Sequence, residues 1–79
     1  IGIYSLQLNK TFTAGEGGAV VTNDARLFER AARFHDVGGL REGHRQMVGE
    51  ARLEPFVGCN FRLNEFSGGV LLAQLRKLD

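Results

Sequence analysis

Apolar and polar residues alternate over residues 1–8, which predicts a short strand with a twist or bulge near Tyr4. A run rich in β-branched residues, 19–22, predicts a second strand that ends at Asn23 and Asp24. Because only a short segment joins the two strands, we expect them to be antiparallel neighbours at the edge of a mixed sheet.

A helical pattern follows the second strand. Asn23 or Asp24 is a suitable N-cap for a helix that runs to about Phe34, and Val37-Gly38-Gly39 ends it. We expect this helix to pack one face on the sheet. The apolar stripe on that face comprises Leu27, Phe28, Ala31, Ala32 and Phe34.

Residues 39–57 are then expected to form a polar loop, and a loop of that length is usually functional or disordered. A second helix is expected from Asn64, its N-cap, to Leu78, with apolar residues on enough of its circumference for burial on two sides. The pair at 68–69 is glycine, which indicates that another backbone passes close by, either in the same subunit or across a dimer interface. The elements together predict an α/β fold, with two short strands flanking the loop that holds Lys10, then two helices separated by a long loop.

Composition narrows the function classes. The 79 residues are 43% hydrophobic, which favours a globular piece over a disordered one. Ten basic and nine acidic residues leave a formal net charge of +1, so we expect no nucleic acid and no membrane as partner. Charges of both signs interleave over residues 26–45, which indicates solvated helix faces. Cys59, the single cysteine, is expected to be a small buried residue, and its isolation is consistent with a cytoplasmic protein.

Lys10 is the candidate for covalent chemistry. It follows the first predicted strand and precedes a glycine cluster at 15–18, where backbone free of side chains can approach a planar ligand. A neutral lysine amine is a nucleophile that can form a Schiff base with a carbonyl group. The same spacing is also typical of a solvated surface lysine.

Two sequence blocks resemble those of a known family. Residues 5–19 contain Ser-x-Gln-x-x-Lys and then Ala-Gly-Glu-Gly-Gly-Ala, and residues 58–65 contain Gly-x-Asn-x-Arg ahead of the second predicted helix. Both blocks resemble the DegT/DnrJ/StrS family of sugar aminotransferases, which use pyridoxal phosphate. Two blocks in the right order are more specific than either one alone.

The resemblance implies a role for five residues. Lys10 would form a Schiff base with pyridoxal 5'-phosphate and then carry the proton that is exchanged at the substrate carbon. Ser5 would contact the cofactor phosphate, and Asn60 would reach across a homodimer interface to the other subunit's cofactor phosphate. Arg62 would bind a carboxylate or phosphate of the substrate or else form an interface salt bridge. Gln7 would hydrogen-bond the substrate or the lysine loop.

The resemblance also implies a fold and a reaction. Residues 1–79 would be an internal fragment of the large domain of a fold type I pyridoxal-phosphate-dependent transferase, without a domain boundary. The parent protein would transfer an amino group from glutamate or glutamine to a keto sugar or keto cyclitol, often nucleotide-linked. The isolated fragment is expected to be inactive, and the alternative is a catalytically inactive remnant or interaction module derived from this fold. No metal site is expected, because His35, Asp36 and His44 match no ligand spacing.

Overall fold

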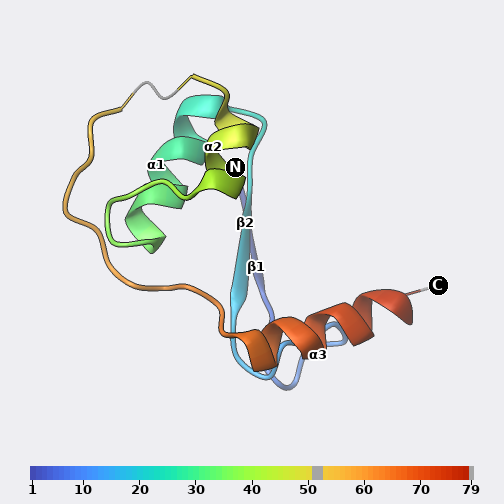
Figure 1. Ribbon diagram of the computed structural model, residues 1–79. Helices are drawn as coiled ribbons and strands as arrows, with labels where there is room; N and C mark the ends of the chain where they lie inside the picture. The colour runs from blue at the N-terminus through green and yellow to red at the C-terminus, as the bar shows by residue number, and fades with distance from the viewer. Residues whose placement is uncertain (51–52, 79) are drawn as a thin grey trace. The chain divides into compact units, whose positions relative to one another are not determined.

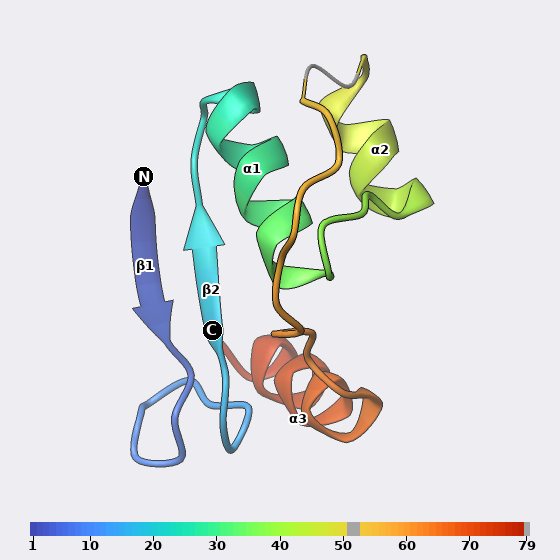
Figure 2. The ribbon, with the colours of Figure 1, turned by 90° about the vertical axis from the view of Figure 1, so that its left-hand side faces the viewer.

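The computed structural model describes residues 1–50 and 53–78. Within them, Figure 1 shows two strands and three helices, in the order β1 (Gly2–Ser5), β2 (Gly18–Val21), α1 (Ala25–His35), α2 (Glu42–Val48) and α3 (Glu65–Arg76). β1 and β2 pair as a two-stranded sheet, and their arrows run in opposite directions in Figure 2. The predicted α/β class and the antiparallel pairing are therefore confirmed. None of the described helices has the length and apolar character needed to cross a membrane.

The chain divides into two compact units. One combines Gly2–Val20 with the segment from Leu63 onward, and we call it the lysine unit because it contains Lys10. The other contains Ile1 and Val21–Arg62, and we call it the helical unit because it contains α1 and α2. That both units belong to a single domain stays a prediction.

Backbone hydrogen bonds and glycines shape the loop between β1 and β2. The Leu6 N–H donates to Gly17 O, and the Ala14 N–H donates to Leu6 O, both at 2.9 Å. Leu6 and Ala14 are buried. Gly15 and Gly17 have φ angles of +84° and +153°, which L side chains rarely adopt, so these glycines allow the loop to fold back on itself.

α3 begins at its predicted cap but is not buried. The Asn64 side-chain oxygen accepts the N–H of Ser67 at 2.8 Å, which confirms the cap. No residue of α3 is buried, and its exposed apolar residues are Phe66, Val70, Leu72 and Leu75. Burial on two sides is therefore wrong for this chain, because no described element covers those residues. An added Cβ at either glycine of 68–69 meets no atom within 4 Å, so no described backbone passes close by.

α1 is capped by Asp24, one of its two predicted caps, yet it buries an unexpected face. Asp24 Oδ1 accepts two backbone N–H groups of the first turn, each at 2.9 Å. Leu27 and Phe34 are 42% and 46% exposed, so the predicted apolar stripe is wrong at these two positions. The buried residues of α1 are Glu29, Ala32 and Arg33.

A buried ion pair explains this change of face. Arg33 Nε donates to Glu29 Oε1 at 3.1 Å, one helical turn away, and Arg33 Nη1 donates to Gly38 O at 3.3 Å. The same Glu29 oxygen also accepts the Leu53 N–H at 3.1 Å. Buried charges require such partners. The predicted solvated face is therefore wrong for Glu29 and Arg33, because their side chains are buried and form hydrogen bonds with the backbone of the surrounding loops.

The predicted loop at 39–57 contains α2, so the long-loop prediction is wrong for Glu42–Val48. Residues 51 and 52 of that loop lie outside the described residues. α2 packs against α1, and the ring of His44 meets that of Phe28 edge-on with 5.9 Å between centroids. A helix of seven residues that includes Gly43 has too little apolar periodicity to be recognised in the sequence.

Residues 58–61 lie against the C-terminal end of α1. The Cys59 N–H donates to Phe34 O at 2.7 Å, and the Phe61 N–H donates to His35 O at 2.8 Å. An added Cβ at Gly58 would lie 2.7 Å from Phe34 O, so only glycine fits there. Cys59 is exposed, which makes its expected burial wrong.

Candidate functional site

Lys10 lines a hollow in the lysine unit. The hollow has a volume of about 400 Å³ and is lined by Tyr4, Ser5, Leu6, Lys10, Phe12 and Ala19. Pockets for small molecules and cofactors commonly hold several hundred cubic ångströms and combine apolar walls with a few polar groups. The hollow has both properties, because apolar residues line it together with Lys10 and Ser5, which are themselves exposed.

The backbone of Gln7 connects these two residues. Its N–H donates to Ser5 Oγ at 3.4 Å, and its carbonyl oxygen accepts the Lys10 N–H at 3.0 Å. The same carbonyl oxygen accepts the hydroxyl of Thr13 at 2.8 Å. The Gln7 side chain is exposed and does not line the hollow. The structure therefore brings Ser5 and Lys10 together and gives Gln7 a supporting position through its backbone.

The polar groups of the hollow retain hydrogen-bonding capacity. Within residues 1–50 and 53–78, Lys10 Nζ forms no ion pair, and Ser5 Oγ accepts one N–H without donating its own hydrogen. A lysine amine and a serine hydroxyl can both donate to a ligand oxygen. The hollow therefore offers two donors to a ligand that carries oxygen atoms.

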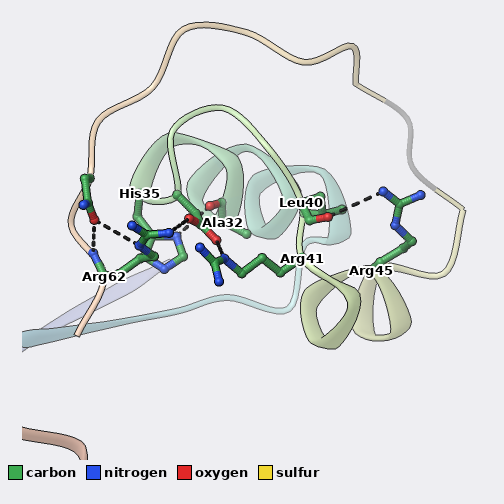
Figure 3. A network of polar contacts seen from close by, with 8 residues as sticks. Ala32, His35, Leu40, Arg41, Arg45 and Arg62 are labelled. Carbon is green, nitrogen blue, oxygen red and sulfur yellow. Dashed lines mark hydrogen bonds and ion pairs between the residues drawn. The ribbon is translucent and has the colours of Figure 1, made fainter. Parts of the chain in front are cut away.

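Asn60 and Arg62 both lie in the helical unit, and their hydrogen bonds lead to Asp36. Figure 3 labels Arg41 and Arg62 in this network. The backbone N–H and the Nε of Arg62 both donate to Asn60 Oδ1 at 3.2 Å. Arg62 Nη1 donates to Asp36 Oδ1 at 3.0 Å, and Arg41 Nε donates to Asp36 Oδ2. Asp36 is only 3% exposed. We call these four residues the Asp36 cluster.

Sequence reasoning paired Asn60 with Arg62 but missed Asp36 and Arg41. The predicted solvated face is wrong for Asp36, which is buried between two arginines. A signal for this arrangement is present, because Asp36 is the C-cap of α1. Carboxylates are unfavourable at a helix C-terminus, where the helix dipole is negative, unless cations compensate. The ion pair of Arg62 is formed within its own chain.

The two histidines make ring contacts. The rings of His35 and His44 meet edge-on with 5.4 Å between centroids, and His35 Nδ1 lies 2.6 Å from Ala32 O. In the part of the chain that the structure describes, no group of three or more His, Cys, Asp or Glu residues has the geometry to hold a metal ion.

The sequence model of the DegT/DnrJ/EryC1/StrS aminotransferase family matches residues 1–79. The chain belongs to this family. Similar DegT/DnrJ/EryC1/StrS relatives include L-glutamine:2-deoxy-scyllo-inosose aminotransferase of Micromonospora echinospora, which is 41% identical over 81 residues. The 3-amino-5-hydroxybenzoate synthase of Amycolatopsis mediterranei is 43% identical over 81 residues. The UDP-4-amino-4,6-dideoxy-N-acetyl-beta-L-altrosamine transaminase of Helicobacter pylori is 40% identical over 75 residues.

These family relatives are much longer than the chain. The three alignments cover 99%, 100% and 95% of this chain but only 19% of each relative. The chain therefore spans about a fifth of the length of the curated relatives that it matches. No solved structure matches the chain significantly.

Proposed function

We propose that the full-length protein is a pyridoxal-phosphate-dependent aminotransferase and that Lys10 carries its chemistry. The observation that supports this proposal most directly is the hollow that Lys10 and Ser5 share, in a chain that belongs to an aminotransferase family. Residues 1–79 form part of a fold type I large domain in this proposal, within a cytoplasmic homodimer.

The residues of the hollow fit the cofactor. Lys10 would hold the aldehyde carbon of pyridoxal phosphate through Nζ, and Ser5 would donate its hydroxyl hydrogen to the phosphate. The Phe12 and Leu6 side chains in the same wall would exclude water from the ring. Pyridoxal phosphate, when bound, supplies the electron sink that stabilises charge at the substrate carbon.

Lys10 then acts as an acid–base group. Its Nζ removes the proton from the carbon that bears the transferred amino group and returns a proton during the second half of the reaction. This role requires an amine that is held near one position without a permanent partner. Two observations in the described residues support this role: the backbone of Lys10 is hydrogen-bonded to Gln7, and its amine forms no ion pair there.

Asn60 and Arg62 supply a second group of contacts in this proposal. Asn60 reaches the cofactor phosphate that is bound by the partner subunit, and Arg62 binds a carboxylate or phosphate of the substrate. Gln7 hydrogen-bonds the substrate through its exposed side chain.

The substrate class follows from the names of relatives. Two of them, at 41% and 42% identity, are named as glutamine-dependent aminotransferases of 2-deoxy-scyllo-inosose and scyllo-inosose. A third, GDP-perosamine synthase of Escherichia coli O157:H7, is 38% identical and is named for a nucleotide-linked amino sugar. We propose a keto cyclitol or a nucleotide-linked keto sugar as amino acceptor, with glutamine or glutamate as donor.

Amino transfer by the full-length protein tests this function. The protein is incubated with pyridoxal phosphate, one amino donor and one keto substrate, and the aminated product is detected by mass spectrometry. We expect a product with at least one cyclitol or nucleotide-linked sugar and its loss in Lys10→Ala. A folded protein that transfers no amino group from glutamine or glutamate would instead favour the inactive remnant.

A further inference from the structure

The Asp36 cluster forms a surface with more hydrogen-bond donors than acceptors. Beyond the contacts that the proposed function gives to Asn60 and Arg62, we propose that Arg41 is a further binding residue for an oxyanion and that Asp36 is a positioning residue for both arginines. The inference rests on the proposed function for the identity of the oxyanion, which is the phosphate of the cofactor or an acidic group of a substrate. The burial of Asp36, the charge of the cluster and the number of its free donors support the oxyanion surface itself.

Asp36 is fixed from several sides. Its carboxylate is 3% exposed, and each of its two oxygens accepts from a different arginine. Its backbone N–H donates to Arg33 O at 3.2 Å, and its backbone pairs with Asn60 in an antiparallel bridge. A carboxylate held in this way can orient two guanidinium groups at once. Figure 3 shows Arg41 and Arg62 converging from different segments of the chain.

The charge of the cluster favours an anion. Two guanidinium groups against one carboxylate leave a formal charge of +1 on the cluster. The side chain of Arg41 is 64% exposed and that of Arg62 is 38% exposed, whereas Asp36 is buried. A ligand that approaches from solvent therefore meets the cations first.

Free donors remain on three side chains. Arg41 uses only Nε on Asp36, which leaves both terminal nitrogens for a ligand. Arg62 uses Nε and Nη1, which leaves Nη2. Asn60 Oδ1 accepts twice from Arg62, so the remaining group of this exposed amide is the donor Nδ2. Guanidinium groups match the planar geometry of carboxylates and the oxygens of phosphates, which makes an oxyanion the ligand class.

Variants of the full-length protein test the binding role. Arg41→Ala and Asp36→Asn are compared with Arg45→Ala. Arg45 is an exposed arginine of α2, and among the described residues its guanidinium donates to Leu40 O alone. We measure kcat, KM for donor and acceptor, and the apparent Kd for pyridoxal phosphate. Arg41→Ala is expected to weaken one of these ligands by about 10-fold or more, since it removes a charge-assisted contact, with a smaller change in kcat.

Asp36→Asn is expected to weaken the same ligand as Arg41→Ala. Arg41→Lys, which retains the charge, is expected to recover part of the loss. A rise in Kd for pyridoxal phosphate identifies the cofactor phosphate as the oxyanion. A rise in donor KM identifies the amino-acid carboxylate, and a rise in acceptor KM with a nucleotide-linked sugar identifies a substrate phosphate. Unchanged ligand affinities in both Arg41→Ala and Asp36→Asn, or equal losses in Arg45→Ala, overturn the inference.

A second readout separates this inference from the proposed function. Inorganic phosphate is titrated into the full-length protein, and binding is followed by calorimetry. We expect Arg41→Ala and Asp36→Asn to weaken phosphate binding and Arg45→Ala to leave it unchanged. This result supports the oxyanion surface even in a protein that transfers no amino group, whereas equal binding by all four proteins contradicts it.

Discussion

The lysine unit and the helical unit hold their candidate site residues by different physical means. In the lysine unit, Lys10 and Ser5 are placed by backbone hydrogen bonds to Gln7 and by glycines with positive φ angles. In the helical unit, Arg62 is placed by its ion pair with the buried Asp36, and Asn60 accepts hydrogen bonds from Arg62. Chemistry at Lys10 requires an amine without a permanent partner, whereas an oxyanion contact benefits from side chains that are already oriented.

The largest effect is expected for Lys10→Ala. Loss of the amine removes both cofactor attachment and proton transfer, so kcat should fall by at least about 10³-fold. The free energy of unfolding should change by less than about 0.5 kcal/mol, because the exposed side chain has no described partner. Steady-state kinetics and urea unfolding measure the two quantities.

Lys77→Ala is the matched control for Lys10→Ala, since these are the two lysines of the chain. It lies at the C-cap of α3 and should leave kcat unchanged. A Lys10→Ala protein that keeps most of its turnover, or a Lys77→Ala protein that loses it, would place the chemistry elsewhere.

Glu29→Ala should show the opposite behaviour to Lys10→Ala. It leaves the buried guanidinium of Arg33 without its carboxylate, and breaking a buried ion pair costs about 3–5 kcal/mol. Urea unfolding of the full-length protein should show this loss, with little change in the affinity for pyridoxal phosphate. A loss below about 1 kcal/mol would mean that the ion pair does not hold the helical unit together.

Gly58→Ala tests the close approach of residues 58–61 to α1. The added Cβ would lie 2.7 Å from Phe34 O and 2.7 Å from Gly38 N, and overpacking of this kind costs about 1–3 kcal/mol. Gly43→Ala is the matched control in α2, where an added Cβ meets nothing within 4 Å. That control should be neutral or stabilising by up to about 1 kcal/mol. Equal effects on the unfolding midpoint would contradict the packing described for Gly58.

Gly15→Ala should have the smallest effect of the series. The added Cβ meets no atom within 4 Å, but the φ angle of +84° is strained for alanine and costs about 1 kcal/mol. Because the lysine loop depends on this conformation, the affinity for pyridoxal phosphate should also fall. A stabilised protein with unchanged cofactor affinity would show that the glycine is not needed for the loop conformation.

The difference between local contacts and contacts between remote residues explains which features the sequence could predict. Local signals identified the cap Asn64, narrowed the other cap to Asn23 or Asp24 and located the strand near 19–22, because each depends on residues close together in the chain. The sequence missed the burial of Asp36, whose partner Arg62 lies 26 positions away. A charged residue is easily predicted to be solvated when the residue that pairs with it lies far away in the sequence.

Helix burial was the other source of error. The exposed Leu27 and Phe34 and the seven-residue α2 differ from expectation because tertiary contacts, and not periodicity, decide which face of a short helix is covered. Cys59 was misplaced for a related reason. Its backbone pairing with α1 determines where the side chain points, and no single-residue preference reveals that pairing.

The most direct test of Lys10 is chemical labelling of the full-length protein. Pyridoxal phosphate is added, the complex is reduced with borohydride, and the attachment site is located by peptide mass spectrometry. We predict that the pyridoxyl group is found on the peptide that contains Lys10, is lost in Lys10→Ala and is retained in Lys77→Ala. Labelling of Lys77 or of a lysine outside this chain, or no labelling of a folded protein, would contradict the account.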